Sequence, residues 1–122
     1  MAVAVTSTGD TDRAAVVATA LDYFEGWFDG DAERMERALH PELAKRGPGL
    51  RTVTKDEMVT WTAEGEGKAL DPGPGRRIGV TVADVHGNIA CAVVDSDVYR
   101  EYLHLVRTDD GWKIVNALWQ SS

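Results

Sequence analysis

The chain has 122 residues, of which 43% are hydrophobic and 27% are charged, and its net charge is −7 because 20 Asp and Glu face 13 Lys and Arg. This length and apolar content fit one globular domain with a single core, and they exclude a disordered tail or a two-domain enzyme. The acidic balance excludes nucleic acid as an expected partner, since the chain repels phosphate backbones.

The cysteine count and the N-terminal residues indicate in which cell compartment the protein is expected. Cys91 is the one cysteine, so neither an internal disulfide nor a cysteine-ligated zinc ion is expected. The first residues lack the basic flank of a signal peptide, and no apolar run is long enough to span a membrane. We therefore expect a single domain over residues 1–122, located in the cytoplasm and without a membrane partner.

A long amphipathic helix is the first predicted element. Asp10 and Asp12 are the two candidates for its N-cap, and Gly30 is expected to end it. Residues 1–9 are then expected to form a flexible N-terminal tail. Two adjacent apolar stripes at helical spacing predict that a wide face packs on a large surface: Val16, Val17, Ala20, Leu21, Tyr23, Phe24, Trp27 and Phe28.

Two shorter helices are predicted next. Asp31 caps the first of them and Pro41 ends it, because proline lacks an amide donor and holds the preceding residue extended. A short segment, residues 42–53, then leads to the capping box Thr54-Lys55-Asp56-Glu57, which begins the other helix. The glycines and prolines of residues 63–77 predict a surface loop. The residues expected to face inward from these helices are Met35, Ala38, Leu39, Met58, Val59 and Trp61.

The second half of the chain predicts an antiparallel sheet. Hairpin turns are expected at Gly87-Asn88 and at residues 108–111. Helices first and strands afterwards predict an α+β domain whose N-terminal helices pack on one face of a curved antiparallel sheet. The predicted strands are residues 76–85, 89–94, 99–107 and 112–119.

The last hairpin predicts which side chains share a face of the sheet. With a loop at residues 108–111, Arg107 lies opposite Trp112. One face then carries the pairs Leu105–Ile114, Leu103–Asn116 and Glu101–Leu118. The other face carries the pairs His104–Val115, Tyr102–Ala117 and Arg100–Trp119.

Both faces of this hairpin are largely apolar, although the helices can cover only one of them. We therefore expect a homodimer in which a second copy covers the outer face. The alternative is a solvent-exposed sheet with scattered apolar residues. The predicted interface residues are Tyr102, His104, Val106, Val115, Ala117 and Trp119.

Several motifs in this order resemble a known superfamily over nearly the whole chain. They are Tyr23-Phe24-Glu25-Gly26-Trp27 with Gly30-Asp31, Leu39-His40-Pro41, Tyr102-Leu103-His104-Leu105, and Gly111-Trp112-Lys113-Ile114-Val115. The pattern resembles the nuclear-transport-factor-2-like superfamily, and within it the SnoaL-like and "putative lumazine-binding" branches. The resemblance implies a cone-shaped, cystatin-like α+β fold with a pocket between the helices and the concave sheet. It does not fix the function, because the superfamily hosts isomerases, dehydratases, cyclases, epoxide hydrolases and plain binders.

The ketosteroid isomerase branch of this superfamily provides a contrast. Tyr23 matches that branch's oxyanion-stabilising tyrosine. The general-base aspartate falls at Gly47 or its neighbour Arg46, and the second oxyanion acid falls at Leu103. Enolisation in that architecture needs a carboxylate base and a neutral carboxylic acid, so classical steroid isomerisation is disfavoured.

The candidate catalytic residues are Tyr23, His40 and Asn116. Tyr23 and Asn116 would polarise a ligand oxygen, and His40 or Lys45 would move a proton. Each of these four residues also has a purely structural interpretation. Tyr23 can be a core residue and His40 a helix cap, while Lys45 can extend to solvent and Asn116 can bond Glu101 or backbone. The other expected pocket residues are Trp27, Trp61, Glu101, Leu103, Leu105, Ile114 and Leu118.

These observations leave three functional hypotheses open. The first is a protein that binds a small, apolar, ring-containing metabolite and, if catalytic, acts as a cofactor-independent dehydratase, cyclase or isomerase. The second is a non-catalytic binding or accessory protein, with a flavin-precursor-like ligand suggested by the family label alone. The third is a protein-interaction module. Neither a cofactor nor a metal is expected, because the three histidines have no metal-ligand spacing.

Overall fold

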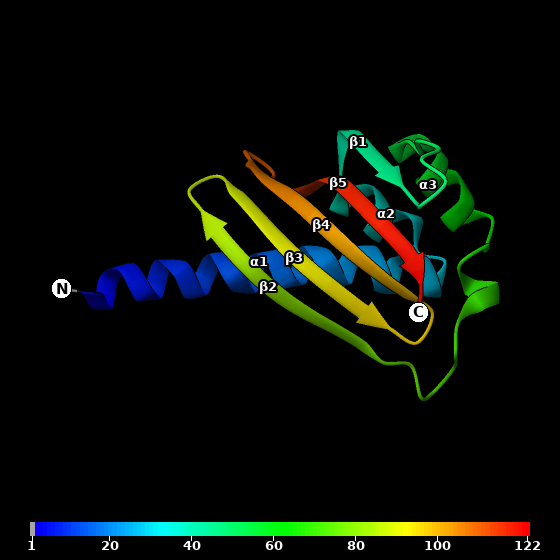
Figure 1. Cartoon of the computed structure of the whole chain (residues 1–122), viewed down its shortest axis with the longest axis horizontal. Helices are drawn as coiled ribbons and strands as arrows, with labels where there is room; N and C mark the ends of the chain where they lie inside the picture. Colours follow the sequence, from blue (N-terminus) through cyan, green and yellow to red (C-terminus); the bar gives the residue numbers. More distant parts are fainter. Residues whose placement is uncertain (1) are drawn as a thin grey trace.

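The computed structural model describes residues 2–122, with side chains from residue 9 onward. Three helices, with one short strand between the second and the third, precede the four antiparallel strands that the sequence predicted. Figure 1 shows α1 (Ala2–Asp29) running behind the sheet, while α2 (Ala32–Ala38) and α3 (Lys55–Ala63) lie at one end of it. The elements are α1 (Ala2–Asp29), α2 (Ala32–Ala38), β1 (Leu39–Arg46), α3 (Lys55–Ala63), the 3-10 turn η1 (Lys68–Leu70), β2 (Ile78–His86), β3 (Ile89–Ser96), β4 (Tyr99–Thr108) and β5 (Gly111–Ser121).

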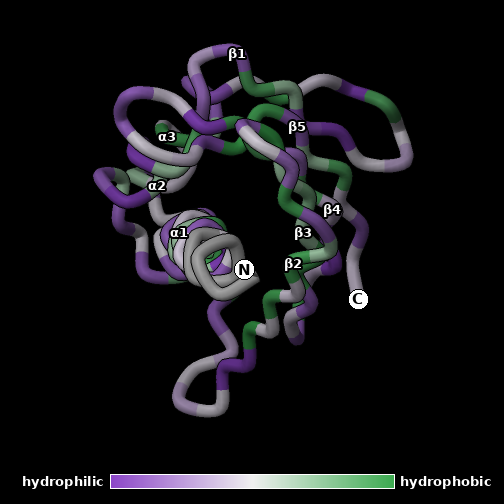
Figure 2. Tube along the Cα trace, turned by 90° about the vertical axis from the view of Figure 1, so that its left-hand side faces the viewer, coloured by the Kyte–Doolittle hydropathy of each residue, from purple (hydrophilic) through white to green (hydrophobic). Residues whose placement is uncertain are grey.

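The five strands form one sheet in the order β1-β5-β4-β3-β2. Neighbouring strands from β2 to β5 are antiparallel, whereas β1 pairs with β5 in parallel. Figure 2 looks along α1 and shows the sheet curving around this helix. We call the face of the sheet toward α1 the inner face and the opposite one the outer face. None of the helices in the described residues is long and apolar enough to cross a membrane.

The first helix is longer than the sequence predicted. It begins at Ala2, so neither Asp10 nor Asp12 is its N-cap, and it ends before Gly30, whose φ of +68° terminates it as predicted. Asp12 is buried and accepts two hydrogen bonds from Arg107 in β4, at 2.9 and 3.0 Å. An aspartate that precedes an apolar stripe can therefore lie inside the helix and contact the sheet, instead of capping the helix.

The region from α2 to α3 confirms both predicted caps and adds an unpredicted strand. Asp31 accepts a hydrogen bond from the Arg34 amide at 3.2 Å, and α2 ends before Pro41. Residues 39–46 form the edge strand β1 instead of an irregular segment. Pro41 is tolerated there because an edge strand has one side without ladder partners. Thr54 and Glu57 make the reciprocal bonds of a capping box at the start of α3.

A β-bulge in the last hairpin corrects the predicted register. Arg107 pairs with Trp112 and Leu105 with Ile114, as predicted, but the register then shifts by one residue. Val115 is the extra residue in β5, because the next pair is His104 with Asn116. The shift exchanges the faces of every residue beyond it. The observed pairs are Leu103–Ala117, Tyr102–Leu118, Glu101–Trp119 and Arg100–Gln120.

Candidate ligand-binding site

A cavity of about 240 Å³ lies between α1, β1, α3 and the inner face of β4 and β5. Its polar lining consists of Tyr23, Lys45 and Glu101, with Arg51 and Glu66 also contributing. Its remaining surface is aromatic or apolar, which is typical of a site that holds a small organic molecule. The residues of this apolar surface are Phe24, Trp27, Val53, Met58, Trp61, Tyr99 and Trp119.

Three side chains from three different elements meet in the wall of this cavity. The Tyr23 hydroxyl on α1 donates a hydrogen bond to Oε1 of Glu101 on β4 at 2.8 Å. The ammonium of Lys45 on β1 donates to the Tyr23 hydroxyl oxygen, and its Nζ lies 3.5 Å from Oε2 of Glu101. We call these residues the Tyr23–Lys45–Glu101 cluster.

The sequence places each member of the cluster by a simple periodicity. Tyr23 belongs to the buried stripe of α1, and it is 2% exposed. Lys45 follows the buried Leu43 at strand spacing, and Glu101 precedes the buried Leu103 at the same spacing. Glu101 is also 2% exposed, and it lines the cavity as expected.

Burial shifts the protonation equilibria of two cluster members in opposite directions. Burial lowers the pKa of the Lys45 ammonium, and the nearby Glu101 carboxylate only partly offsets this change. Burial raises the pKa of the Tyr23 phenol well above its usual value, and the negative charge of Glu101 raises it further. Tyr23 therefore stays a hydrogen-bond donor across the physiological pH range, while the Lys45 amine is easier to deprotonate than an exposed lysine.

Four aromatic side chains line the cavity beside the cluster, and three of them contact one another. The Trp27 indole donates to the Tyr99 hydroxyl at 3.3 Å, and the Tyr99 ring meets the Trp119 ring edge-on with centroids 5.7 Å apart. Trp61 lies beneath the Arg51 guanidinium, whose carbon is 5.8 Å from the ring centroid. These flat surfaces can contact the faces of a ring-containing ligand.

The structure brings together five of the predicted pocket residues. They are Tyr23, Trp27, Lys45, Trp61 and Glu101.

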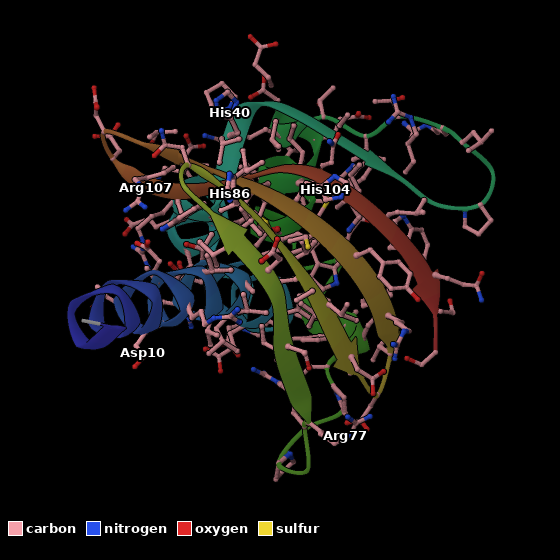
Figure 3. All side chains as sticks on the ribbon, turned by 60° about the vertical axis from the view of Figure 1, so that its left-hand side comes forward. Asp10, His40, Arg77, His86, His104 and Arg107 are labelled. Carbon is pink, nitrogen blue, oxygen red and sulfur yellow. The ribbon has the colours of Figure 1, made fainter. Side chains whose placement is uncertain are left out.

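The other predicted site residues lie outside the cavity lining. His40 stands at the start of β1 (Figure 3), where its Nδ1 accepts a hydrogen bond from the Glu42 amide at 3.0 Å. The prediction that Asn116 and Leu118 face the pocket is wrong, because the bulge turns both to the outer face. Asn116 is exposed beside His104, and Leu118 is 49% exposed. Three further residues are buried core and do not line the cavity: Leu103, Leu105 and Ile114.

The same bulge corrects the predicted dimer residues. Trp119 lines the cavity and Ala117 is buried in the core, so neither is available on the outer face. Sequence reasoning also missed Tyr99, Arg51, Val53 and Glu66 as lining residues. The alternating apolar pattern of β4 contained a signal for Tyr99, which has the same parity as Glu101 and Leu103. No local pattern indicated the loop residues, because tertiary packing alone brings them to the cavity.

Known structures place this geometry in a recognised fold class. A nuclear-transport-factor-2-like protein of unknown function from Silicibacter pomeroyi aligns with a TM-score of 0.73 and 22% identity, over 96% of this chain and 98% of that one. An NTF2-like protein with a cystatin-like fold from Novosphingobium aromaticivorans gives a TM-score of 0.75 and 21% identity, over 95% and 85%. A ketosteroid isomerase-like protein from Erwinia carotovora atroseptica gives 0.65 and 17%, over 88% and 94%.

These likenesses confirm the cone-shaped, cystatin-like α+β fold of the nuclear-transport-factor-2-like superfamily. Within that superfamily, residues 11–120 match the family described as "Putative lumazine-binding", and the chain belongs to that family. No curated protein sequence is detectably similar to it.

Proposed function

We propose that the cavity binds a small ring-containing molecule that carries both a hydrogen-bond acceptor and a hydrogen-bond donor on one edge. The observation that carries this proposal is the Tyr23–Lys45–Glu101 cluster in an aromatic wall. The family description names lumazine, a fused bicyclic ring whose carbonyl groups and ring nitrogens form such an edge.

Hydrogen-bond counting supports a ligand of this kind. The Lys45 ammonium has three N–H donors, of which one bonds the Tyr23 hydroxyl and one faces Glu101, so one remains for a ligand oxygen. The Glu101 carboxylate has acceptor positions beyond those used by Tyr23 and Lys45, and these suit a ligand N–H group. The charges of Lys45 and Glu101 offset each other, so a neutral ligand meets a balanced site.

Tryptophan fluorescence provides a direct test. Three of the four tryptophans line the cavity, so titration with lumazine is expected to quench the emission with saturation. Lys45→Met should weaken binding by roughly tenfold or more, because it removes a charge-assisted hydrogen bond. Lys113→Met is the matched control, since Lys113 donates to the Arg37 carbonyl far from the cavity. Equal affinity in the two variants, or no saturable quenching at all, would contradict the proposal.

A catalytic version of this function is favoured by one specific contact. Lys45, an amine with a lowered pKa, bonds directly to the hydroxyl of Tyr23, and this pairing suits proton transfer to and from a bound ligand. The carboxylate beside Tyr23 comes from Glu101, whereas position 103 is a core leucine. A cofactor-independent dehydratase, cyclase or isomerase would lose turnover in Tyr23→Phe while retaining ligand binding. Turnover that survives in Tyr23→Phe would exclude this version.

We further propose that two copies associate through the outer face. Support comes from Ile89, Tyr102 and Leu118, which are about half exposed on neighbouring strands. Asn116 and Leu118 replace Ala117 and Trp119 in the expected interface because of the bulge. Sedimentation should then give a dimer that Tyr102→Glu converts to a monomer, and a monomeric wild-type protein would contradict the proposal.

A further inference from the structure

Lys45 is a primary amine held in the wall of a cavity. Its side chain is 12% exposed, and its Nζ lies 5.0 Å from the centroid of the Tyr23 ring and 5.7 Å from that of Trp119. Its ion-pair partner, Glu101, is only 3% exposed at the side chain. The amine therefore has flat aromatic surfaces beside it and a carboxylate that water barely reaches.

Lys55 provides a contrast within the same chain. Its side chain is 13% exposed and also pairs with a glutamate, Glu36, at 2.9 Å. Glu36 is 60% exposed, however, and Lys55 does not line the cavity. Nearly equal side-chain exposure thus accompanies two different settings: an ion pair with an exposed partner at Lys55, and an amine in the wall of the cavity at Lys45.

We propose that Lys45 forms a reversible imine with an aldehyde or ketone group of a ring-containing ligand. The proposal rests on the proposed function, because the aromatic cavity must first hold the ring next to Nζ. It adds a covalent step and names the ligand class as aromatic or cyclic carbonyl compounds. Buried lysines are suited to this chemistry because a neutral amine is the nucleophile, and burial lowers the pKa of the Lys45 ammonium.

The groups around Nζ accept and return the proton that imine formation requires. The Lys45 ammonium first gives a proton to the Glu101 carboxylate, and the neutral nitrogen then forms a bond to the carbonyl carbon. A proton then passes from the attacking nitrogen to the carbonyl oxygen, which becomes the hydroxyl of a neutral carbinolamine. Loss of that hydroxyl as water, with a proton returned from the Glu101 carboxylic acid, leaves the C=N bond. Overall, one amine and one carbonyl give one imine and one water, with no change in oxidation state.

Two features of the cluster favour the forward direction. The protonated imine keeps the positive charge of the ammonium that it replaces, so the Glu101 carboxylate balances it equally well. The Tyr23 hydroxyl donates to Glu101 and accepts from Lys45, so it holds beside Nζ the carboxyl group that returns the proton to the leaving hydroxyl. At Lys55 the corresponding carboxylate, Glu36, is 60% exposed to water.

Reductive trapping tests the proposal on the intact protein. Benzaldehyde with cyanoborohydride, applied near neutral pH at limiting time, converts each imine to a stable benzyl amine that peptide mapping locates. Because a lowered pKa leaves more of the Lys45 amine neutral and the cavity holds the ring beside Nζ, we expect label on Lys45 to exceed that on Lys55 by on the order of tenfold. Lys45→Met should remove this excess label, whereas Lys55→Met should leave it unchanged.

The outcomes separate this proposal from the binding function. Label on Lys45 that does not exceed the label on Lys55, Lys68 or Lys113 would overturn it, and mapping of the wild-type protein alone decides this point. Benzyl alcohol, which lacks the carbonyl, should protect Lys45 by competing for the same cavity. Saturable lumazine quenching without excess label on Lys45 would retain the binding function and reject the imine. Absence of both would reject both.

Discussion

Two polar clusters join α1 to β4, and they differ in how many of their hydrogen-bonding groups are satisfied. Arg107 donates to both Asp12 oxygens, to the Gly87 carbonyl and to the Asn88 side chain, and its guanidinium carbon lies 5.0 Å from the Trp112 ring centroid. Figure 3 shows Arg107 toward the N-terminal end of α1. The Tyr23–Lys45–Glu101 cluster lies further along the helix and borders a cavity, where it keeps unused donors and acceptors.

This difference separates the polar contacts that stabilise the fold from those that are available to a ligand. A guanidinium with nearly all of its donors satisfied fixes the position of a helix on a sheet. A cluster with spare hydrogen-bonding capacity beside an enclosed space can also recognise a molecule. Four substitutions test this contrast, in decreasing order of their expected effect.

Glu101→Gln is expected to lower the free energy of unfolding by about 3 kcal/mol, because it leaves the Lys45 ammonium buried without its counter-charge. The double variant Lys45→Met with Glu101→Leu should recover most of this loss, since neither partner is then left uncompensated. Urea unfolding at neutral pH measures both. If Glu101→Gln alone were as stable as the wild type, the stability of the cluster would not depend on charge pairing.

Gly67→Ala is expected to destabilise the cavity wall by about 2 kcal/mol, because of overpacking. A Cβ at this position would lie 2.3 Å from the Trp27 carbonyl oxygen and 2.4 Å from Cδ2 of its ring, so the loop must move. Gly75→Ala is the matched control, since a Cβ there meets nothing within 4 Å. Unfolding midpoints and lumazine affinity should both fall only in Gly67→Ala. Equal behaviour of the two variants would show that the loop does not support Trp27.

Asp12→Asn is expected to cost about 1 kcal/mol of stability, a modest figure because Arg107 is partly exposed. It should leave lumazine affinity unchanged, since the Asp12–Arg107 pair does not line the cavity. Asp10→Asn, on the exposed side of the same helix, should change neither property. Weakened binding in Asp12→Asn would show that the two clusters are coupled.

Tyr23→Phe is expected to change the pH dependence of stability in the alkaline range. Burial raises the pKa of Tyr23, so the folded protein keeps a proton that the unfolded chain releases above its usual value of 10.0. The stabilisation is therefore complete below about pH 10 and is lost as the pH rises further. Unfolding free energies between pH 8 and about 11 should fall less steeply in Tyr23→Phe. A Tyr23→Phe slope equal to that of the wild type would show that Tyr23 does not contribute to this pH dependence.

The sequence was sufficient for the elements whose signals are local. The caps at Asp31 and Thr54, the turn at Gly87-Asn88 and the apolar stripe of α1 each depend on residues a few positions apart. The predicted start of α1 was wrong because aspartate is a residue type preferred at N-caps, whereas the real partner of Asp12, Arg107, is distant in sequence. Strand β1 was missed because its pairing partner is the distant β5 and its sequence contains a proline.

The site was predictable only where it did not depend on the last strand. Tyr23, Lys45 and Trp61 follow helix or strand periodicity and were placed in the pocket. Residues 116–119 were assigned to the wrong faces because a bulge adds one residue to β5, and alternation reverses beyond it. The polar Asn116 in an apolar inward row was the one local sign of the bulge, and it was interpreted instead as a group that orients a ligand.

The parallel pairing of β1 with β5 also constrains the order of folding. The hairpins between β2 and β5 join strands that are adjacent in sequence, and short loops close rapidly. The cavity, by contrast, needs contacts such as Tyr23 with Glu101, which are 78 residues apart. During synthesis from the N-terminus, Lys45 can pair early with the nearby Val53, whereas its other neighbour, β5, is the last strand to leave the ribosome. The cavity wall around this amine is therefore completed only at the end of synthesis, when Trp119 emerges.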